Sequence, residues 1–220
     1  MASVACVVEG DGEVAALPIL IRRIAAAVDP GWYVEVPRPF QVKRTRMGNR
    51  FGDLERGIEF ILRQARPPVA LLVLLDLDDD DPVSLHAELS QRVKAYRGDV
   101  PSAVVLARRE YEAWFLAAAE SLRGRRGLPN DLGPPPDPEA VKDAKGWLRD
   151  HMPRTRKYSE TADQPALTDL FDLDLARTRS ASFAHCYREV ERLLRALLAS
   201  PVADVGQTAP APGGELPPPS

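Results

Sequence analysis

The sequence predicts an α/β fold in which helices flank a mainly parallel, Rossmann-like central sheet. Apolar stretches of strand length alternate four times with segments in which apolar residues recur every three or four positions. The strongest stretch, residues 69–75, is continuously apolar, which is typical of a central parallel strand covered on both faces. With 220 residues, the chain is long enough for one main core and an appended helical part.

A strand, a helix and a second strand are predicted at the start of the chain. Residues 3–9 form a Val-rich strand that ends in a tight Gly-containing turn. Apolar residues on one face then predict a helix at 13–28, although Pro18 delays its regular part to as late as Leu17. Residues 32–37 alternate as a second strand, and the prolines at its end place it at or near an edge of the sheet.

The middle of the chain repeats this alternation. The basic segment 43–50 has no periodicity and predicts a loop, and a helix follows at 52–66. After the central strand, Asp81 and Pro82 fit the N-cap and first position of a helix that runs to about Tyr96. The remaining predicted elements are a strand at 102–107 and helices at 110–122, 138–151 and 183–198.

These elements divide the chain into three parts. Residues 1–122 form the core, and residues 123–199 form a C-terminal helical extension packed on it. Residues 200–220 are rich in Pro, Ala and Gly with few large apolar side chains, which predicts a disordered tail.

Composition argues against several classes of protein. The formal net charge of −3 is not that of a strongly basic nucleic-acid-binding domain, although most of the 29 basic residues are Arg, which suits phosphate. Cys6 and Cys186 have no CxxC spacing, so neither a disulfide framework nor a zinc site is expected. No P-loop or dinucleotide motif occurs. An acidic residue at position 9 interrupts any signal-peptide core, so we expect a cytoplasmic protein.

Three acidic clusters follow predicted strands. Because the carboxyl ends of parallel strands meet at one edge of a sheet, their side chains are expected to lie close together. Carboxylates gathered there are typical of a magnesium site. The clusters are Glu9 with Glu13, Asp76 with Asp78, and Glu110 with Glu112.

The second cluster is the strongest of the three. If the strand continues beyond residue 75, alternation points Asp76 and Asp78 to the same side. Five Asp within residues 76–81 repel one another unless a cation offsets them, while Asp81 serves as a helix cap. The alternative is a solvated loop that leads into the next helix.

The other two clusters are more ambiguous. Glu13 also fits the N-terminus of a helix, where an acidic residue is stabilising whether or not it binds metal. Glu110 and Glu112 are separated by roughly 200° on a helix, so both cannot face one site equally. One of the two is therefore expected to be structural, and the sequence does not say which.

The segments Val8-Glu9-Gly-Asp-Gly-Glu13, Asp76-Leu-Asp78 and Arg109-Glu110-Tyr-Glu112-Ala-Trp114 resemble the TOPRIM-like family of bacterial proteins of unknown function. That family is related to the nuclease TOPRIM domain of OLD-family proteins, and the similarity covers residues 3–198. It implies that Glu9 acts as a metal ligand or general acid/base, and that Glu13, Asp76 and Asp78 bind magnesium. It also implies a further ligand at Glu110 or Glu112, and often an ABC-type ATPase encoded nearby in anti-phage systems. One departure is that no Lys lies in the first turn, which leaves charge compensation to Arg.

Together these observations predict a Mg²⁺- or Mn²⁺-dependent phosphodiesterase or endonuclease, with DNA favoured over RNA as substrate. One or two metal ions held by the four acidic residues of the first two clusters would polarise the scissile phosphate and activate water. The basic loop is expected to contact the nucleic-acid backbone, unless it is only a solvated surface. Its candidate contact residues are Lys43, Arg44, Arg46 and Arg50.

Two other functions stay open. The chain could be a non-catalytic regulatory or toxin-like binding module of an ATPase complex, in which case an acidic ligand is expected to be missing, and none is. It could also be a metal-dependent phosphohydrolase that acts on a small nucleotide, which activity without a polymer would reveal.

Overall fold

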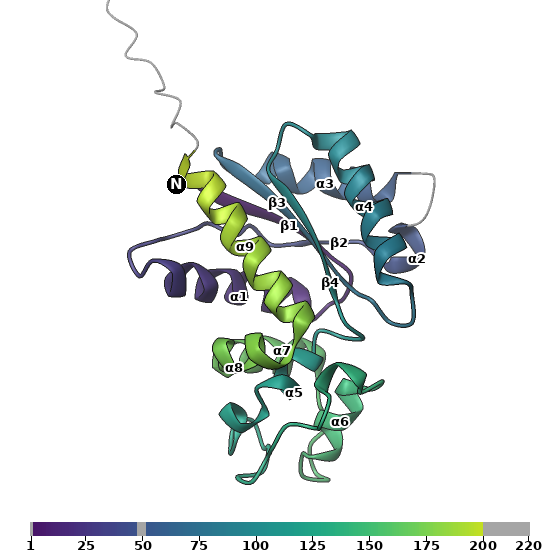
Figure 1. The fold of residues 1–220 in the computed structure, drawn as a ribbon, viewed down its shortest axis with the longest axis vertical. Helices are drawn as coiled ribbons and strands as arrows, with labels where there is room; N and C mark the ends of the chain where they lie inside the picture. Colours follow the sequence, from purple (N-terminus) through teal and green to yellow (C-terminus); the bar gives the residue numbers. More distant parts are fainter. Residues whose placement is uncertain (1, 48–51, 200–220) are drawn as a thin grey trace, which may run out of the picture.

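Four parallel strands form the central sheet in the order β2, β1, β3, β4 (Figure 1). This is a computed structural model, which describes residues 2–47 and 52–199. The predicted parallel α/β fold is confirmed, and β3 is central as its continuous apolar run indicated. The tail at 200–220 and Arg50 lie outside the described residues. The strands are β1 (Ser3–Val8), β2 (Phe40–Gln41), β3 (Val69–Asp76) and β4 (Ser102–Ala107).

Helices cover both faces of the sheet and divide the core in two (Figure 1). On one face, α1 (Glu13–Val28) and α9 (Ala181–Ala199) pack against side chains such as Leu72. On the other face, α3 (Asp53–Gln64) and α4 (Pro82–Arg97) pack against side chains such as Val73. Because successive strand residues point to opposite faces and both are covered, the strands are apolar throughout rather than alternating.

The predicted second strand at 32–37 is wrong. Within it, Glu35 alone forms an isolated bridge with Ser3, and its backbone oxygen accepts a hydrogen bond of 2.9 Å from the Val4 N–H. The prolines at positions 37 and 39 have no N–H to donate, so the ladder is interrupted and resumes as β2. The strand does lie at the edge of the sheet, as those prolines indicated.

Helix α1 begins at Glu13, so the predicted delay to Leu17 is wrong. Pro18 lies inside the helix on its buried side. A proline there removes one intrahelical hydrogen bond. The helix continues because its apolar face, which includes Leu20 and Ile24, is fully buried against the sheet.

Several other predicted elements differ in extent. The basic segment 43–50 contains the short helix α2 (Arg44–Met47) instead of only a loop. The helix predicted at 110–122 begins later, at Ala113, and is divided into two short helices. The Tyr111 N–H, before the first of them, donates a hydrogen bond of 2.8 Å to the side chain of Asp76. The observed elements of the C-terminal half are α5 (Ala113–Ala117), η1 (Ala119–Leu122), η2 (Pro138–Ala140), α6 (Ala144–Asp150), α7 (Glu160–Leu170) and α8 (Leu173–Arg179), of which α7 and α8 are not predicted by the sequence.

The unpredicted helix α7 packs against α1, beside the carboxyl edge of the sheet (Figure 1). The close approach depends on Gly12, the residue that precedes α1. A Cβ atom at Gly12 would overlap Oε1 of Gln164 and lie 3.0 Å from the backbone oxygen of Glu160.

Within residues 2–47 and 52–199, none of the helices combines the length and apolar character that a membrane crossing needs.

Replacing Gly12 with Ala is therefore expected to lower the free energy of unfolding by about 1–3 kcal/mol, because the added methyl group displaces a buried, hydrogen-bonded glutamine. Chemical denaturation measures the change. Gly133→Ala is the matched control, since a Cβ there meets no atom within 4 Å. Equal stability of the two variants would show that α7 is free to move away from α1.

Candidate metal-binding site

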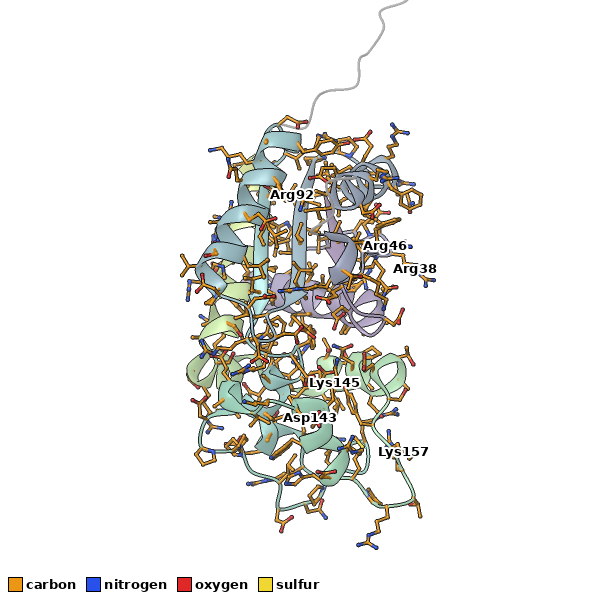
Figure 2. All side chains as sticks on the ribbon, turned by 90° about the vertical axis from the view of Figure 1, so that its right-hand side faces the viewer. Arg38, Arg46, Arg92, Asp143, Lys145 and Lys157 are labelled. Atoms are coloured by element: carbon orange, nitrogen blue, oxygen red, sulfur yellow. The ribbon has the colours of Figure 1, made fainter. Side chains whose placement is uncertain are left out.

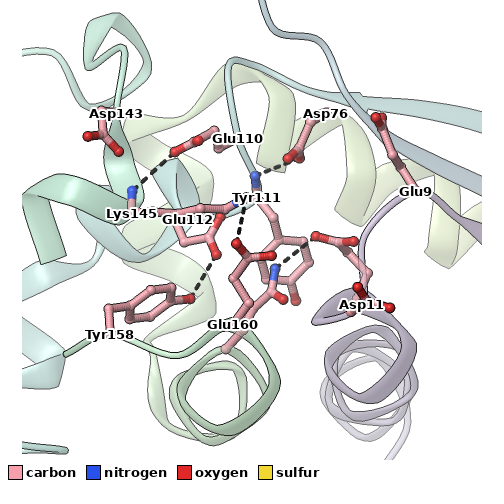
Figure 3. Close-up of polar contacts among 12 residues, drawn as sticks. Glu9, Asp11, Asp76, Glu110, Tyr111, Glu112, Asp143, Lys145, Tyr158 and Glu160 are labelled. Carbon is pink, nitrogen blue, oxygen red and sulfur yellow. Dashed lines mark hydrogen bonds and ion pairs between the residues drawn. The ribbon is translucent and has the colours of Figure 1, made fainter. Parts of the chain in front are cut away.

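One acidic residue from each predicted cluster reaches a common region beyond the carboxyl edge of the sheet. Figure 3 shows two of the three, Asp76 and Glu112. Asp76 is the last residue of β3, Glu13 is the first residue of α1, and Glu112 lies directly before α5. Glu9 follows β1 at the border of this region. The parallel sheet brings them together because its strands all end at the same edge. We call Glu13, Asp76 and Glu112 the carboxylate cluster.

Asp76 lies at the centre of this cluster. Its Oδ1 accepts the hydrogen bond from the Tyr111 N–H, and its backbone oxygen accepts one of 2.7 Å from Arg44. Burial raises the pKa of Asp76 well above its ordinary value, and the charges of Glu13 and Glu112 raise it further. The nearby Lys145 ammonium and the Tyr111 N–H oppose these effects.

Glu13 is only 4% exposed, which is unusual for an acidic residue at a helix N-terminus. Its Oε1 accepts a hydrogen bond of 3.0 Å from Nε2 of Gln164 on α7. Its Oε2 is buried without a hydrogen-bond partner among the described residues. A Cβ at Gly10 would overlap this oxygen, so the turn after β1 needs glycine to leave it room. Glu13 thus does more than interact with the helix dipole.

Glu112 is fully buried. The Tyr158 hydroxyl donates a hydrogen bond of 2.8 Å to Oε1 of Glu112, while Oε2 has no such partner in the part of the chain that the structure describes. Burial raises the pKa of Glu112 to about 8, although Lys145 and Tyr158 favour its charged form. At neutral pH this side chain therefore binds a proton unless a cation replaces it.

Lys145 on α6 is the basic residue that faces the carboxylate cluster (Figure 3). Its Nζ lies 3.5 Å from Oε1 of Glu160. Burial disfavours the charged ammonium, but Glu112 and Asp76 more than offset this and raise the pKa of Lys145 above its ordinary value. It therefore stays protonated, and its ammonium acts on two of the three carboxyl groups of the cluster.

The acidic clusters give no signal for Lys145 or Tyr158, because these residues come from the helical extension and reach the site only through folding. Gln164 lies in the segment Thr161-Ala-Asp-Gln164-Pro, which is part of the family resemblance, but its contact with Glu13 is not predicted. The resemblance left charge compensation to Arg. In the structure a lysine provides it, from α6 instead of from the first turn.

Glu9 is half-buried and lies beside Arg44, whose Nη1 is 3.9 Å from Oε2 of Glu9. Burial raises the pKa of Glu9; Arg44 opposes this, whereas Asp78 and Glu13 add to it. Oε2 of Glu9 is buried and has no hydrogen-bond partner within residues 2–47 and 52–199. Glu9 is therefore a fourth carboxylate at the border of the cluster.

The condition for the expected alternation of Asp76 and Asp78 is not met, because the strand does not continue to Asp78. The strand ends at Asp76, and Leu77 turns into the core beneath α4. Asp78 then adopts a left-handed conformation with φ of 51° and is exposed to solvent. Its charge still raises the pKa of Glu9, so it lies near that residue rather than inside the cluster.

The structure separates the roles of Glu110 and Glu112. Oε2 of Glu110 accepts a hydrogen bond of 3.1 Å from the backbone N–H of Lys145, which ties the start of α6 to this turn. Burial raises the pKa of Glu110 as well, and the hydrogen bond from Lys145 opposes that rise. Glu112 faces the cluster, whereas Glu110 positions the helix that carries Lys145.

The basic residues after β2 are less available than the sequence indicates. Arg44 forms an ion pair with Asp80 as well as its hydrogen bond to the backbone of Asp76, and Lys43 lies 3.4 Å from Asp11. Arg46 is exposed (Figure 2). Arg44 thus holds the loops after β2 and β3 together.

The donors of the carboxylate cluster fit a divalent cation. Carboxylate oxygens are the ligands that Mg²⁺ and Mn²⁺ prefer, and an unpaired buried oxygen is costly without a cation or a proton. Among the described residues, Oε2 of Glu13 and Oε2 of Glu112 are such oxygens, and Oε2 of Glu9 has the ion pair with Arg44 but no hydrogen bond. In the described residues, however, no three acidic, His or Cys side chains already stand in an arrangement that could hold a metal ion. The site has the donors without a preformed coordination geometry.

Comparison with known proteins gives one match. The model of a family described as a domain of unknown function, DUF4276, matches residues 8–191, from the end of β1 into α9. The matched region contains every residue of the carboxylate cluster and Lys145. No curated protein and no solved structure matches the chain.

Proposed function

Because the chain belongs to the DUF4276 family, a domain of unknown function, we propose its function from the site itself: a Mg²⁺- or Mn²⁺-dependent phosphodiesterase of the TOPRIM type that cleaves nucleic acid. The observation that supports this most directly is the carboxylate cluster, in which the Lys145 ammonium acts on Asp76 and Glu112 while Glu13 adds a third carboxyl group beside Asp76. Two of the three keep a buried oxygen without a hydrogen-bond partner among the described residues. A divalent cation would offset the repulsion among these carboxylates and would also give the unpartnered oxygens a ligand contact.

Glu13, Asp76 and Glu112 are the residues that would hold the metal ion, with Glu9 at its border. When bound, Mg²⁺ or Mn²⁺ would polarise a phosphate oxygen and lower the pKa of a water molecule. The raised pKa of Glu9, caused mainly by its burial, makes its carboxylate a better proton acceptor than an ordinary glutamate. Each of these roles uses a carboxylate that lies at the end of a parallel strand, in the turn after it or at the start of the following helix.

The hollow next to the cluster suits a phosphodiester. It has a volume of about 410 Å³, and Lys145, Arg149 and Tyr158 line it together with Asp11 and Glu160. The ammonium of Lys145 can therefore pair with a phosphate oxygen that approaches the cluster. The order of the acidic residues along the chain and the resemblance to TOPRIM proteins support the same reaction, and they extend the proposal to an ABC-type ATPase partner.

Titration with Mg²⁺ and Mn²⁺ tests the proposal. Calorimetry should show binding that weakens as pH is lowered, because protons compete for Asp76 and Glu112. At a metal concentration 100 times Kd, the free energy of unfolding should rise by about 2–3 kcal/mol. Cleavage of single-stranded DNA, duplex DNA and RNA is followed in parallel, with EDTA as the control.

The same titration separates the alternatives. Absence of metal binding at pH 8 would sink the proposed function. Binding without cleavage of any polymer, with and without a candidate ATPase, would favour a non-catalytic binding module. Hydrolysis of small nucleotides with intact polymers would favour a nucleotide phosphohydrolase.

A further inference from the structure

A second hollow adjoins the first and is larger, with a volume of about 590 Å³. Both hollows are lined by Asp11 and Thr161, so they meet at the turn after β1 and the first turn of α7. The second hollow runs along the edge of the sheet beside β2. We call it the edge groove, and its other lining residues include Arg38, Phe40, Gln41, Phe60 and Gln64.

Two aromatic rings lie in the edge groove. Phe60 on α3 is 52% exposed, and its ring centroid lies 5.0 Å from that of the half-buried Phe40. Phe40 is held in place from below, since a Cβ at Gly57 would lie 2.8 Å from its ring. The Phe40 ring is thus fixed, and it supports a Phe60 ring that presents an apolar surface to solvent. An exposed aromatic surface inside a groove is typical of a binding site.

The groove also carries unneutralised positive charge. Arg38 is exposed at its rim and has no ion-pair or hydrogen-bond partner in the region that the structure describes. Lys145 lies in the adjoining hollow, on the opposite, helical side (Figure 2), where Glu160 is its ion-pair partner at 3.5 Å. Cations on both sides of an aromatic ring fit a chain of phosphates with bases between them.

The edge groove is connected to the candidate metal site through Gln41. Its Nε2 donates a hydrogen bond of 3.1 Å to the backbone oxygen of Glu9. A ligand in the edge groove therefore lies next to the residue that borders the carboxylate cluster. This arrangement suits one nucleotide beside a phosphate at the cluster.

We infer that the edge groove is a subsite for an unpaired nucleobase, which stacks on Phe60 while its phosphates contact Arg38 and Lys145. This inference rests on the proposed function and names its substrate class: single-stranded polynucleotide, or duplex with frayed ends, rather than intact duplex. A base within a duplex is already stacked on both faces, so it has no free face for Phe60. DNA and RNA share this stacking chemistry, and the 2′-hydroxyl distinguishes them.

Phe60→Trp provides a readout that does not depend on cleavage. In EDTA, oligo-dT and oligo-U are titrated into the variant, and the added tryptophan fluorescence is expected to be quenched by single strands and not by a blunt duplex. Tyr96→Trp is the matched control, because Tyr96 is an exposed aromatic residue on α4, is 42% exposed and does not line the groove. Phe60→Ala is expected to weaken single-strand binding about 10-fold, whereas Phe60→Tyr should retain it.

The outcomes keep the two proposals apart. Equal quenching by duplex and single strand, or equal quenching of the Phe60→Trp and Tyr96→Trp variants, would overturn the subsite even if metal-dependent cleavage is observed. Quenching specific to Phe60→Trp without cleavage in any metal would support the base subsite and count against the phosphodiesterase. Because Phe60 is exposed, its substitution by tryptophan is expected to leave the fold intact, and circular dichroism checks this.

Discussion

Replacing Asp76 with Asn is expected to lower the rate of metal-dependent cleavage by about 10²–10³-fold and to weaken Mg²⁺ binding strongly. Asp76 lies between Glu13 and Glu112, and both of these charges act on it. Asn removes the negative charge but keeps an oxygen that can accept the hydrogen bond from the Tyr111 N–H, so the fold should persist. Cleavage rates and calorimetric metal affinity measure the effect.

Asp78→Asn is the matched control for this variant. Asp78 is exposed, and Asn tolerates its left-handed backbone, so the change should alter cleavage less than about 10-fold and leave stability nearly unchanged. Equal losses in the two variants would mean that Asp76 and Asp78 act as a symmetric pair, as the sequence suggested. Full activity of Asp76→Asn would exclude the proposed mechanism.

Replacing Glu112 with Gln is expected to stabilise the metal-free protein at pH 8 by about 4–5 kcal/mol. In the folded protein, burial raises the pKa of Glu112 to about 8, whereas an unfolded Glu titrates near about 4.3. A group whose pKa is higher in the folded than in the unfolded protein contributes stability that is complete below its pKa in the unfolded protein. That stability is lost as the pH rises towards its pKa in the folded protein. Gln carries no such charge, and its oxygen can still accept the hydrogen bond from Tyr158.

The measurement is urea unfolding at pH 5, 6, 7 and 8, first in EDTA. The wild-type protein should lose stability more steeply than Glu112→Gln between pH 5 and 8, and both should keep the contribution of Asp76. Glu88→Gln on α4 is the control, since Glu88 is exposed and its change should stay within about 0.5 kcal/mol. Saturating Mg²⁺ should stabilise wild type more than Glu112→Gln and so narrow the difference between them, because only wild type keeps the Glu112 carboxylate as a ligand. If the free energies of unfolding of wild type and Glu112→Gln changed in parallel with pH in EDTA, the pKa of Glu112 would not be raised in the folded protein.

The effects expected at Glu112 on stability without metal and on affinity for metal have one physical cause. Buried acidic groups are costly in the metal-free protein, and the same groups are the donors of the metal site. Stability without metal and affinity for metal are therefore expected to change in opposite directions at Glu112. Lys145 limits the cost without removing it, because one ammonium cannot neutralise the whole cluster.

The parts of the fold that depend on near neighbours in the chain could be predicted. The apolar runs of β1, β3 and β4 are visible because a strand covered on both faces must be apolar throughout. Asp81 is recognisable as a cap because its side chain needs only the N–H of Ser84, three residues away. The sequence was less informative for β2, where prolines decide which residues can pair.

The candidate site could be predicted only in outline. That acidic residues would follow strands β1, β3 and β4 is readable from the sequence, because strand ends are local features and a parallel sheet brings them to one edge. Which acid faces inward is not readable, because it depends on one or two dihedral angles. Asp78 adopts a left-handed conformation instead of the expected extended one. The late start of α5, directly after Glu112, decides that Glu112 rather than Glu110 faces the cluster.

By itself, the sequence determined the parallel α/β architecture and the strand-end positions of the acidic residues, since both follow from short-range periodicity. Only the tertiary structure decided which carboxyl groups are buried together and what faces them. Glu13 meets Gln164 across 151 residues, and Lys145 reaches Asp76 and Glu112 from a separate helix. Such contacts have no local signature, and the burial that shifts the pKa of each group exists only once the helical extension has packed against the sheet.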